Sequence, residues 1–484
     1  MHFDLLAIGS GPAGQKAALQ ASKLGKRAAV VERMDVLGGV SIHTGTIPSK
    51  TLREAVIYLT GYHQRTFYGH EYAVDDDITM EDLITRAQQV IQHQVQIATK
   101  HLQINGIEVL HGQGAFVDAH TIAVTEADGA GTRVTADFVL IATGSEAARP
   151  SEVPFDGARV LTSDDLLRLP AIPESLAVIG GGIIGTEYAG IFAALGIPVS
   201  LIDRRPRLLP FVDGEVADAL ASHFIENRVQ LYLDEDVSDI DTSDPDAVQL
   251  HLESGKTVRA AAVLYAIGRV GITDGLHLEA AGLQTDERGC VPVNLHCQTA
   301  VSNIYAAGDV IGSPALAATS MEQGRLAACH AFDVPEQTAS VPLPYAIYTV
   351  PEIAMLGPIS EQLDEAGVEY VVGCAAYNEI ARGRMLGDHA GFLKMLFHAP
   401  TGRLVGIHAV GVHASELIHI GQAVMAFGGR IDYFIDTVFN YPTLAECYKA
   451  AALDAANDLR RAGTYGNIDM FVPAPPVPRL EAKE

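Results

Sequence analysis

Glycine recurs with the same spacing in two segments of the chain, Gly9-Ser-Gly-Pro-Ala-Gly14 and Gly180-Gly-Gly-Ile-Ile-Gly185. Each segment follows a short apolar run and precedes a helix-like stretch, after which a second apolar run ends on an acid, Glu32 or Asp203. Glycines at this spacing let the backbone approach a pyrophosphate, whose charge a helix N-terminus stabilises, while the acid accepts hydrogen bonds from ribose hydroxyls. The sequence therefore predicts two dinucleotide sites in one chain.

A lysine closes the segment Gly38-Gly-Val-Ser-Ile-His-Thr-Gly-Thr-Ile-Pro-Ser-Lys50. Besides this lysine, the segment contributes the hydroxyls of Ser41 and Thr46. An ammonium group held near a bound redox cofactor stabilises negative charge there, and a surface lysine on a helix is the alternative interpretation.

Alternating strand-like and helix-like segments must position these residues. Strands are predicted at 5–8 and 27–31 around the first glycine loop, and at 175–179 and 199–202 around the second. From Met80 to Ala98, apolar residues recur every three or four positions, which predicts one long amphipathic helix. Strands alternating with helices indicate an α/β chain with two Rossmann-like units.

Charged residues follow the strand of the second unit. Asp203 suits the free 2′-hydroxyl of a ribose, whereas Arg204, Arg205 and Arg207 can neutralise a 2′-phosphate. This combination predicts tolerance of both NAD(H) and NADP(H). A solvated charged turn is the alternative.

Length, charge and cysteine content argue against several other classes of function. The 484 residues suggest about three domains. The 33 basic and 59 acidic residues give a formal charge of −26, which opposes binding to nucleic acid or to an anionic membrane. We expect no signal peptide or membrane span, and five scattered cysteines favour reduced thiols in a cytoplasmic protein. The spacing of His408, His413 and His419 fits no common metal site, so no metal is expected.

The segment ending in Lys50 resembles the active-site segment of the flavin-dependent disulfide reductases, which runs Gly-Cys-Ile-Pro-Ser-Lys and carries two cysteines four residues apart. Ser41 and Thr46 stand at those cysteine positions here. Near the C-terminus, Asn440-Tyr-Pro-Thr443 resembles the family's His-Pro-Thr, with Tyr441 in place of the proton-shuttling histidine of the partner subunit. Tyrosine, with an ordinary pKa near ~10, is a poor acid or base at neutral pH.

These paired replacements resemble the soluble pyridine nucleotide transhydrogenases, which belong to the class I pyridine nucleotide-disulfide oxidoreductases and are similar to lipoamide dehydrogenase without its redox dithiol. The resemblance extends from Asp4 to about Arg461. Ser41 departs from it, because a single cysteine is expected there. One thiol cannot form the local disulfide, so the departure leaves the interpretation unchanged.

The resemblance implies a domain order. An FAD-binding domain takes residues 1–150 and returns at 271–340, an NAD(P)-binding domain takes 151–270, and a C-terminal α+β dimerisation domain takes 341–465. Residues 466–484, rich in proline, are expected to form a mobile tail. The family assembles as a homodimer or a larger homo-oligomer. Thr443-x-x-Glu446 is expected to form a capping box at the start of the last helix.

The resemblance also implies roles for individual residues. Lys50 and Glu187 are the expected catalytic pair, with Lys50 facing the N5 and N1 side of the flavin. The expected FAD contacts are Gly9, Gly11, Gly14, Glu32, Lys50, Gly114, Thr143, Gly144, Ser145, Asp309 and Ala317. The expected NAD(P) contacts are Gly180, Gly182, Gly185, Glu187, Asp203, Arg204, Arg205, Gly268 and, with weaker support, Val237.

Without a dithiol, electrons on the flavin have no sulfur relay to an external disulfide. We therefore expect a transhydrogenase, in which NADPH reduces FAD, NADP⁺ leaves, and NAD⁺ enters to take the hydride. The resemblance implies that it is of the Si-specific type. An NAD(P)H oxidase or quinone reductase has the same motifs. A flavin-binding sensor without turnover is the alternative from another class.

Overall fold

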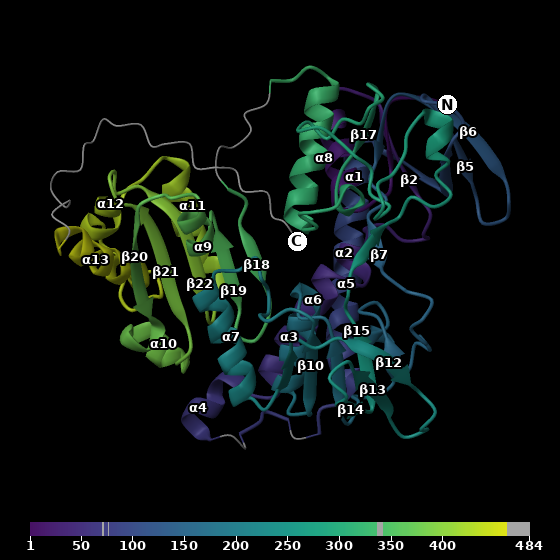
Figure 1. The fold of residues 1–484 in the computed structure, drawn as a ribbon. Helices are drawn as coiled ribbons and strands as arrows, with labels where there is room; N and C mark the ends of the chain where they lie inside the picture. Colours follow the sequence, from purple (N-terminus) through teal and green to yellow (C-terminus); the bar gives the residue numbers. More distant parts are fainter. Residues whose placement is uncertain (70–71, 76, 336–341, 462–484) are drawn as a thin grey trace.

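The computed structural model describes residues 1–69, 72–75, 77–335 and 342–461. The predicted tail at 466–484 and the end of the predicted dimerisation domain lie outside these residues. Three large sheets organise the described chain, and Figure 1 shows the first sheet above the second on the right and the third on the left. The fold is mixed α/β.

The first sheet has the strand order β3-β2-β1-β6-β5-β4, with β17 paired to β6. Strands β1, β2, β3, β6 and β17 run parallel, and β4 and β5 form an antiparallel extension. The strands are β1 (His2–Ile8), β2 (Ala28–Glu32), β3 (Glu108–His111), β4 (Gln113–Phe116), β5 (Thr121–Thr125), β6 (Gly131–Ile141) and β17 (Ile304–Ala306). Helices α1 (Pro12–Lys23) and α8 (Ala317–Ala331) lie side by side on this sheet (Figure 1).

The second sheet is parallel throughout, in the order β11-β10-β9-β15-β8. Its strands are β8 (Val160–Leu161), β9 (Leu176–Ile179), β10 (Val199–Asp203), β11 (Gln230–Leu233) and β15 (Ala262–Tyr265). An antiparallel sheet of β12 (Val237–Asp241), β13 (Val248–Leu252) and β14 (Thr257–Ala260) accompanies it. Helix α6 (Ile183–Ala194) is apolar on nearly every side and is buried, and α7 (Gly214–Glu226) packs beside β11.

Two connections join the nucleotide units. Strands β7 (Ser145–Ala147) and β16 (Arg269–Gly271) pair as an antiparallel ribbon. Helix α3 (Thr46–Leu59) packs against α6 of the second unit and against the long helix α5 (Met80–Ile104). The amphipathic prediction for 80–98 is confirmed, because Met80, Leu83, Ala87 and Ala98 are buried along one face. Helix α3 begins at Thr46, so Lys50 lies on its first turns.

The third sheet is antiparallel, in the order β18-β19-β22-β21-β20. Its strands are β18 (Tyr345–Ile347), β19 (Ile353–Leu356), β20 (Tyr370–Ala376), β21 (Phe392–His398) and β22 (Leu404–Val410). The helices around it are α9 (Ser360–Glu365), α10 (Ala381–Leu386), α11 (Ala414–Ala426), α12 (Ile431–Asp436) and α13 (Glu446–Arg461). Helix α13 packs on β20 and β21, and α11 packs on β22 (Figure 1).

The capping box predicted at Thr443 and Glu446 is wrong. Helix α13 begins at Glu446 itself, so Thr443 lies outside the capping position. The Thr443 hydroxyl donates to the carbonyl of Asn440 at 2.7 Å, and Glu446 Oε2 is buried without a hydrogen-bond partner in the described chain. Thr443 therefore belongs to the turn before α13, where its side chain makes a local hydrogen bond, and it does not cap the helix.

Among the described residues, no helix is both long enough and apolar enough to cross a membrane.

Candidate active site and cofactor cavity

The first glycine loop joins β1 to α1. Gly9 has a φ of +109°, and a Cβ atom there would lie 2.3 Å from the carbonyl oxygen of Ala142. A Cβ on Gly14 would lie 1.9 Å from the carbonyl oxygen of Gly9, so this glycine allows α1 to pack closely on the strand. No side chain caps the N-terminus of α1, and its backbone N–H groups are available to an anion.

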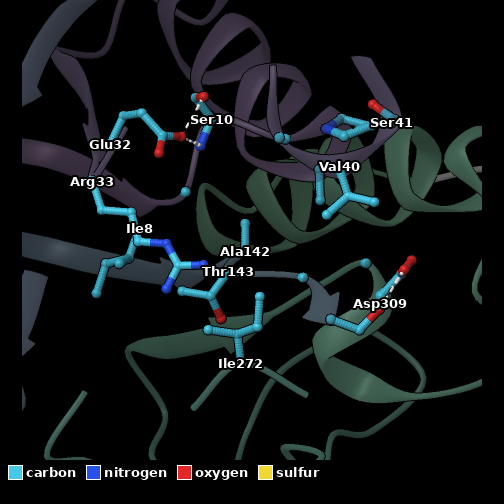
Figure 2. A pocket seen from close by; sticks show the side chains of 18 of the residues that line it. Ile8, Ser10, Glu32, Arg33, Val40, Ser41, Ala142, Thr143, Ile272 and Asp309 are labelled. Atoms are coloured by element: carbon cyan, nitrogen blue, oxygen red, sulfur yellow. Dashed lines mark hydrogen bonds between the residues drawn. The ribbon is translucent and has the colours of Figure 1, made fainter. Parts of the chain in front are cut away.

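A cavity of about 310 Å³ opens at this loop. Most of the residues predicted to contact a flavin line it, although they come from β1, β2, β4, β7 and the loops before α3 and α8. The lining includes Gly9, Gly11, Glu32, Ser41, Thr46, Gly114, Thr143, Gly144, Ser145, Asp309 and Ala317 (Figure 2). Gly14 and Lys50 are not part of this lining.

Polar groups in the cavity fit an extended dinucleotide. Thr143 Oγ1 is buried with no hydrogen-bond partner among the described residues, so it can serve a ligand. Glu32 accepts from the Ser10 N–H at 3.0 Å and from the Met34 N–H at 2.9 Å, which fixes its carboxylate at the end of β2. Asp309 accepts from the Ser145 hydroxyl at 2.8 Å through Oδ2 alone (Figure 2).

Several lining residues were missed from sequence. Arg33 directly follows Glu32 and reaches into the cavity, and His43 lies on α2 (Gly39–His43) with Nε2 placed 2.9 Å from the Leu37 carbonyl oxygen. Ile272 and Asp274 reach the cavity from the chain that returns after β16. The position of Arg33 next to the terminal acid of a strand was an available signal, whereas nothing local marks Ile272 or Asp274.

Lys50 and Glu187 meet between the two nucleotide units. Lys50 Nζ donates to both carboxylate oxygens of Glu187, at 2.9 and 2.7 Å. The Glu187 side chain is 5% exposed and the Lys50 side chain 25% exposed. Tyr348, next to β18, donates its N–H to Glu187 Oε1 at 2.9 Å, and its ring centre lies 5.2 Å from Lys50 Nζ. All three sheet regions therefore contribute to this one ion pair.

The second glycine loop repeats the geometry of the first. Gly180 has a φ of +112°, and a Cβ on Gly185 would lie 1.8 Å from the carbonyl oxygen of Gly180. Gly182 caps α6 with no side-chain hydrogen bond, which leaves the helix N-terminus open to an anion. Gly268 follows β15 with a φ of +83°. Val237 begins β12 and packs against the apolar cluster that contains Ile202 and Leu250.

Asp203 ends β10 and is engaged by its neighbours. Arg205 makes a bidentate ion pair with it, and the Gly181 N–H donates a short hydrogen bond to its Oδ2. Burial opposes ionisation of Asp203, but the hydrogen bonds from Arg205 and Gly181 outweigh burial and lower the pKa of this carboxyl below its ordinary value. Arg204 is exposed, and Arg207 pairs with Asp218 at 3.2 Å.

Hydroxyl groups occupy the two positions where the resembled reductases carry thiols. Ser41 Oγ donates to the Gly38 carbonyl at 3.3 Å, and Thr46 begins α3 at the cavity wall. The free cysteines of the described chain, Cys290, Cys297, Cys329, Cys374 and Cys447, are all absent from the cavity lining. Tyr441 is 74% exposed on the surface of the third sheet region.

Comparisons with known proteins agree with this geometry. Residues 3–324 match the family model described as pyridine nucleotide-disulphide oxidoreductase, and residues 343–452 match its dimerisation domain. The soluble pyridine nucleotide transhydrogenase of Mycobacterium tuberculosis is 49% identical, covering 96% of this chain and 99% of the relative. The transhydrogenase of the same name from Colwellia psychrerythraea is 42% identical over 94% of this chain and 98% of its own length.

Solved structures show the same architecture. LpdA from Mycobacterium tuberculosis superposes with a TM-score of 0.85 at 29% identity, covering 93% of this chain and 99% of that one. The flavoprotein disulfide reductase RclA from Escherichia coli, solved as a Cu(II) complex, superposes with a TM-score of 0.84 at 27% identity, covering 94% and 99%. The chain belongs to the pyridine nucleotide-disulphide oxidoreductase family, with the soluble pyridine nucleotide transhydrogenases among its full-length relatives.

Proposed function

We propose that this protein is an FAD-dependent transhydrogenase that moves a hydride between NADPH and NAD⁺. The observation that carries the proposal is a dinucleotide cavity whose two redox positions hold the hydroxyls of Ser41 and Thr46 beside an intact Lys50–Glu187 ion pair. The names of the relatives at 42% and 49% identity point to the same activity.

The cavity residues would hold FAD in an extended conformation. Gly9 and Gly11 with the open N-terminus of α1 would bind the pyrophosphate, and Glu32 would accept from the adenosine ribose. Thr143 Oγ1, Asp309 Oδ1 and the backbone of Gly114, Gly144 and Ala317 would serve the rest of the cofactor, with Gly14 supporting the loop from behind. When bound, FAD would supply an isoalloxazine ring able to take up and release a hydride.

The Lys50–Glu187 pair supplies charge where the two nucleotide units meet. The Lys50 ammonium would stabilise negative charge on a bound flavin, without the reorganisation that water would need. Glu187, fixed by Lys50 and by the Tyr348 N–H, keeps that ammonium in place on one side of the junction. Both nicotinamides would use the second loop in turn, at Gly180, Gly182, Gly185, Asp203, Arg204, Arg205 and Gly268, with Val237 beside the adenine.

We propose a homodimer as the working assembly. A match to a dimerisation domain supports it, and so do apolar side chains that stand out from the third sheet region, with Phe427 92% and Val438 89% exposed. The scattered free cysteines favour the cytoplasm as the compartment.

Steady-state assays separate this proposal from its alternatives. Holoenzyme under anaerobic conditions, given NADPH and thio-NAD⁺ with no other acceptor, is expected to form thio-NADH through many turnovers. Oxygen uptake or quinone reduction that greatly exceeds nucleotide transfer would identify an oxidase or quinone reductase instead. A flavin that neither NADPH nor NADH bleaches would identify a binding protein without turnover.

A further inference from the structure

The carboxylate of Asp203 has no acceptor position left for a ligand. Its Oδ1 accepts from the backbone N–H and from Nε of Arg205, both at 2.8 Å. Its Oδ2 accepts from Nη2 of Arg205 at 2.9 Å and from the Gly181 N–H through a short bond. Two oxygens offer about four lone-pair positions, and all four are used here. The side chain is also 4% exposed, so water does not compete for it.

An acid at this place in a Rossmann unit normally selects NAD(H), because it accepts from the ribose 2′-hydroxyl and repels a 2′-phosphate. With the Arg205 guanidinium laid across it, the carboxylate neither accepts nor presents an uncompensated negative charge. A 2′-phosphate that enters the site meets a cation in place of a bare acid. The arrangement thus removes the usual barrier to NADP(H).

The neighbouring arginines do not share this arrangement. Arg207 points away, because its guanidinium pairs with Asp218 at 3.2 Å and with Glu361 at 3.5 Å, on α7 and α9. Arg204 is exposed on the loop and forms no ion pair with another residue of the described chain. Of the three arginines, Arg205 is the one that pairs with the acid and also lies at the phosphate loop, where its Nη2 is 3.9 Å from the position of a Cβ on Gly182.

We propose that Arg205 is the residue that allows one pocket to take both NAD(H) and NADP(H), an inference that rests on the proposed function. With the guanidinium over Asp203, the pocket admits a 2′-phosphate. With the guanidinium turned away, Asp203 accepts from the ribose hydroxyls of NAD(H). The Arg205 side chain is 39% exposed, so it can leave the carboxylate without opening the core.

Equilibrium binding of nucleotide fragments to the holoenzyme tests this proposal. The probes are 5′-AMP and 2′,5′-ADP, which differ only by the 2′-phosphate. In Arg205→Gln, the Kd of 2′,5′-ADP is expected to rise about tenfold or more, because Asp203 regains an unopposed charge, while the Kd of 5′-AMP stays the same or falls. Arg207→Gln is the matched control, and it keeps the ratio of the two Kd values.

The double variant D203N/R205Q separates neutralisation from direct contact. Removing the charge that Arg205 opposes should return the Kd of 2′,5′-ADP to within about threefold of the unmodified protein. The proposal is overturned if Arg205→Gln weakens both probes equally, if it changes neither, or if the double variant stays as weak as Arg205→Gln. Flavin content and thermal midpoint confirm that each variant is folded. Neither probe carries nicotinamide, so the result stands even if hydride transfer is absent.

Discussion

Replacing Glu187 by glutamine tests the ion pair at the junction of the nucleotide units. Glutamine keeps the size of the side chain and one acceptor oxygen but removes the charge. Lys50, whose side chain is only 25% exposed, then loses its counter-ion. The Tyr348 N–H keeps a neutral acceptor. We expect both lower stability and slower flavin reduction.

The size of the effect follows from burial. Removing one partner of a fully buried pair costs ~3–5 kcal/mol, whereas exposed pairs contribute ~0–1 kcal/mol. Glu187 is almost fully buried, but Lys50 retains partial contact with water, and the amide still accepts one hydrogen bond. The expected loss in the free energy of unfolding is therefore ~2 kcal/mol. The rate constant for flavin bleaching by NADPH is expected to fall ~10-fold or more, because the ammonium is no longer held in place.

Glu108→Gln provides a matched control. Glu108 pairs with Arg27 at the same 2.7 Å separation, but the two side chains are 44% and 54% exposed. Urea unfolding of both variants at one protein concentration, together with stopped-flow bleaching by NADPH, measures the difference. Equal stability losses for Glu187→Gln and Glu108→Gln, with unchanged bleaching, would refute the reasoning.

Three further predictions concern other parts of the chain. Alkylation of the holoenzyme with iodoacetamide should leave the rate of hydride transfer within about twofold of the untreated rate. No described cysteine lines the cavity, and burial raises the pKa of the Cys290 thiol. Stoichiometric loss of activity with one modified thiol would contradict this. Gly14→Ala should abolish flavin retention, since its Cβ would lie 1.9 Å from the Gly9 carbonyl oxygen, whereas Gly131→Ala, with nothing within 4 Å, should retain flavin as the unmodified protein does. Burial lowers the pKa of His408 from 6.5 to about 4, so the unfolded chain takes up this proton at a higher pH than the folded chain. The free energy of unfolding should therefore fall by up to ~3 kcal/mol as pH drops from 6.5 to 4. In His408→Gln this free energy should depend less steeply on pH, and an unchanged dependence would reject this role.

The parts of the fold that sequence predicted are those set by local pattern. Each glycine loop lies between a strand and a helix, as predicted. The close packing at Gly14 and Gly185 requires glycine, and the spacing of the glycines in the sequence indicates this requirement. The same holds for α5, whose buried face follows the apolar period. Strands β1 and β2 pair in parallel, and so do β9 and β10, as the β-α-β connection through each glycine loop requires.

Contacts between segments far apart in the chain could not be predicted from the sequence. Tyr348 lies 161 residues from Glu187, yet its backbone N–H fixes one carboxylate oxygen, and no pattern around Tyr348 marks a backbone donor. The pairing of Arg205 with Asp203 is close in sequence, but the choice among three arginines depends on the partners of Arg207 on α7 and α9. The capping box was wrong because α13 begins at Glu446, beyond the turn in which the Thr443 hydroxyl donates to the Asn440 carbonyl.

The most direct test of the account follows the two half-reactions separately in an anaerobic stopped-flow instrument. NADPH should bleach the flavin of the holoenzyme, and NAD⁺ added after removal of NADP⁺ should restore its absorbance with one NADH formed per flavin. Lipoamide and glutathione disulfide should leave the bleached flavin unchanged over the same interval. Reoxidation by either disulfide, with none by NAD⁺, would contradict the claim that hydride leaves by the nicotinamide route.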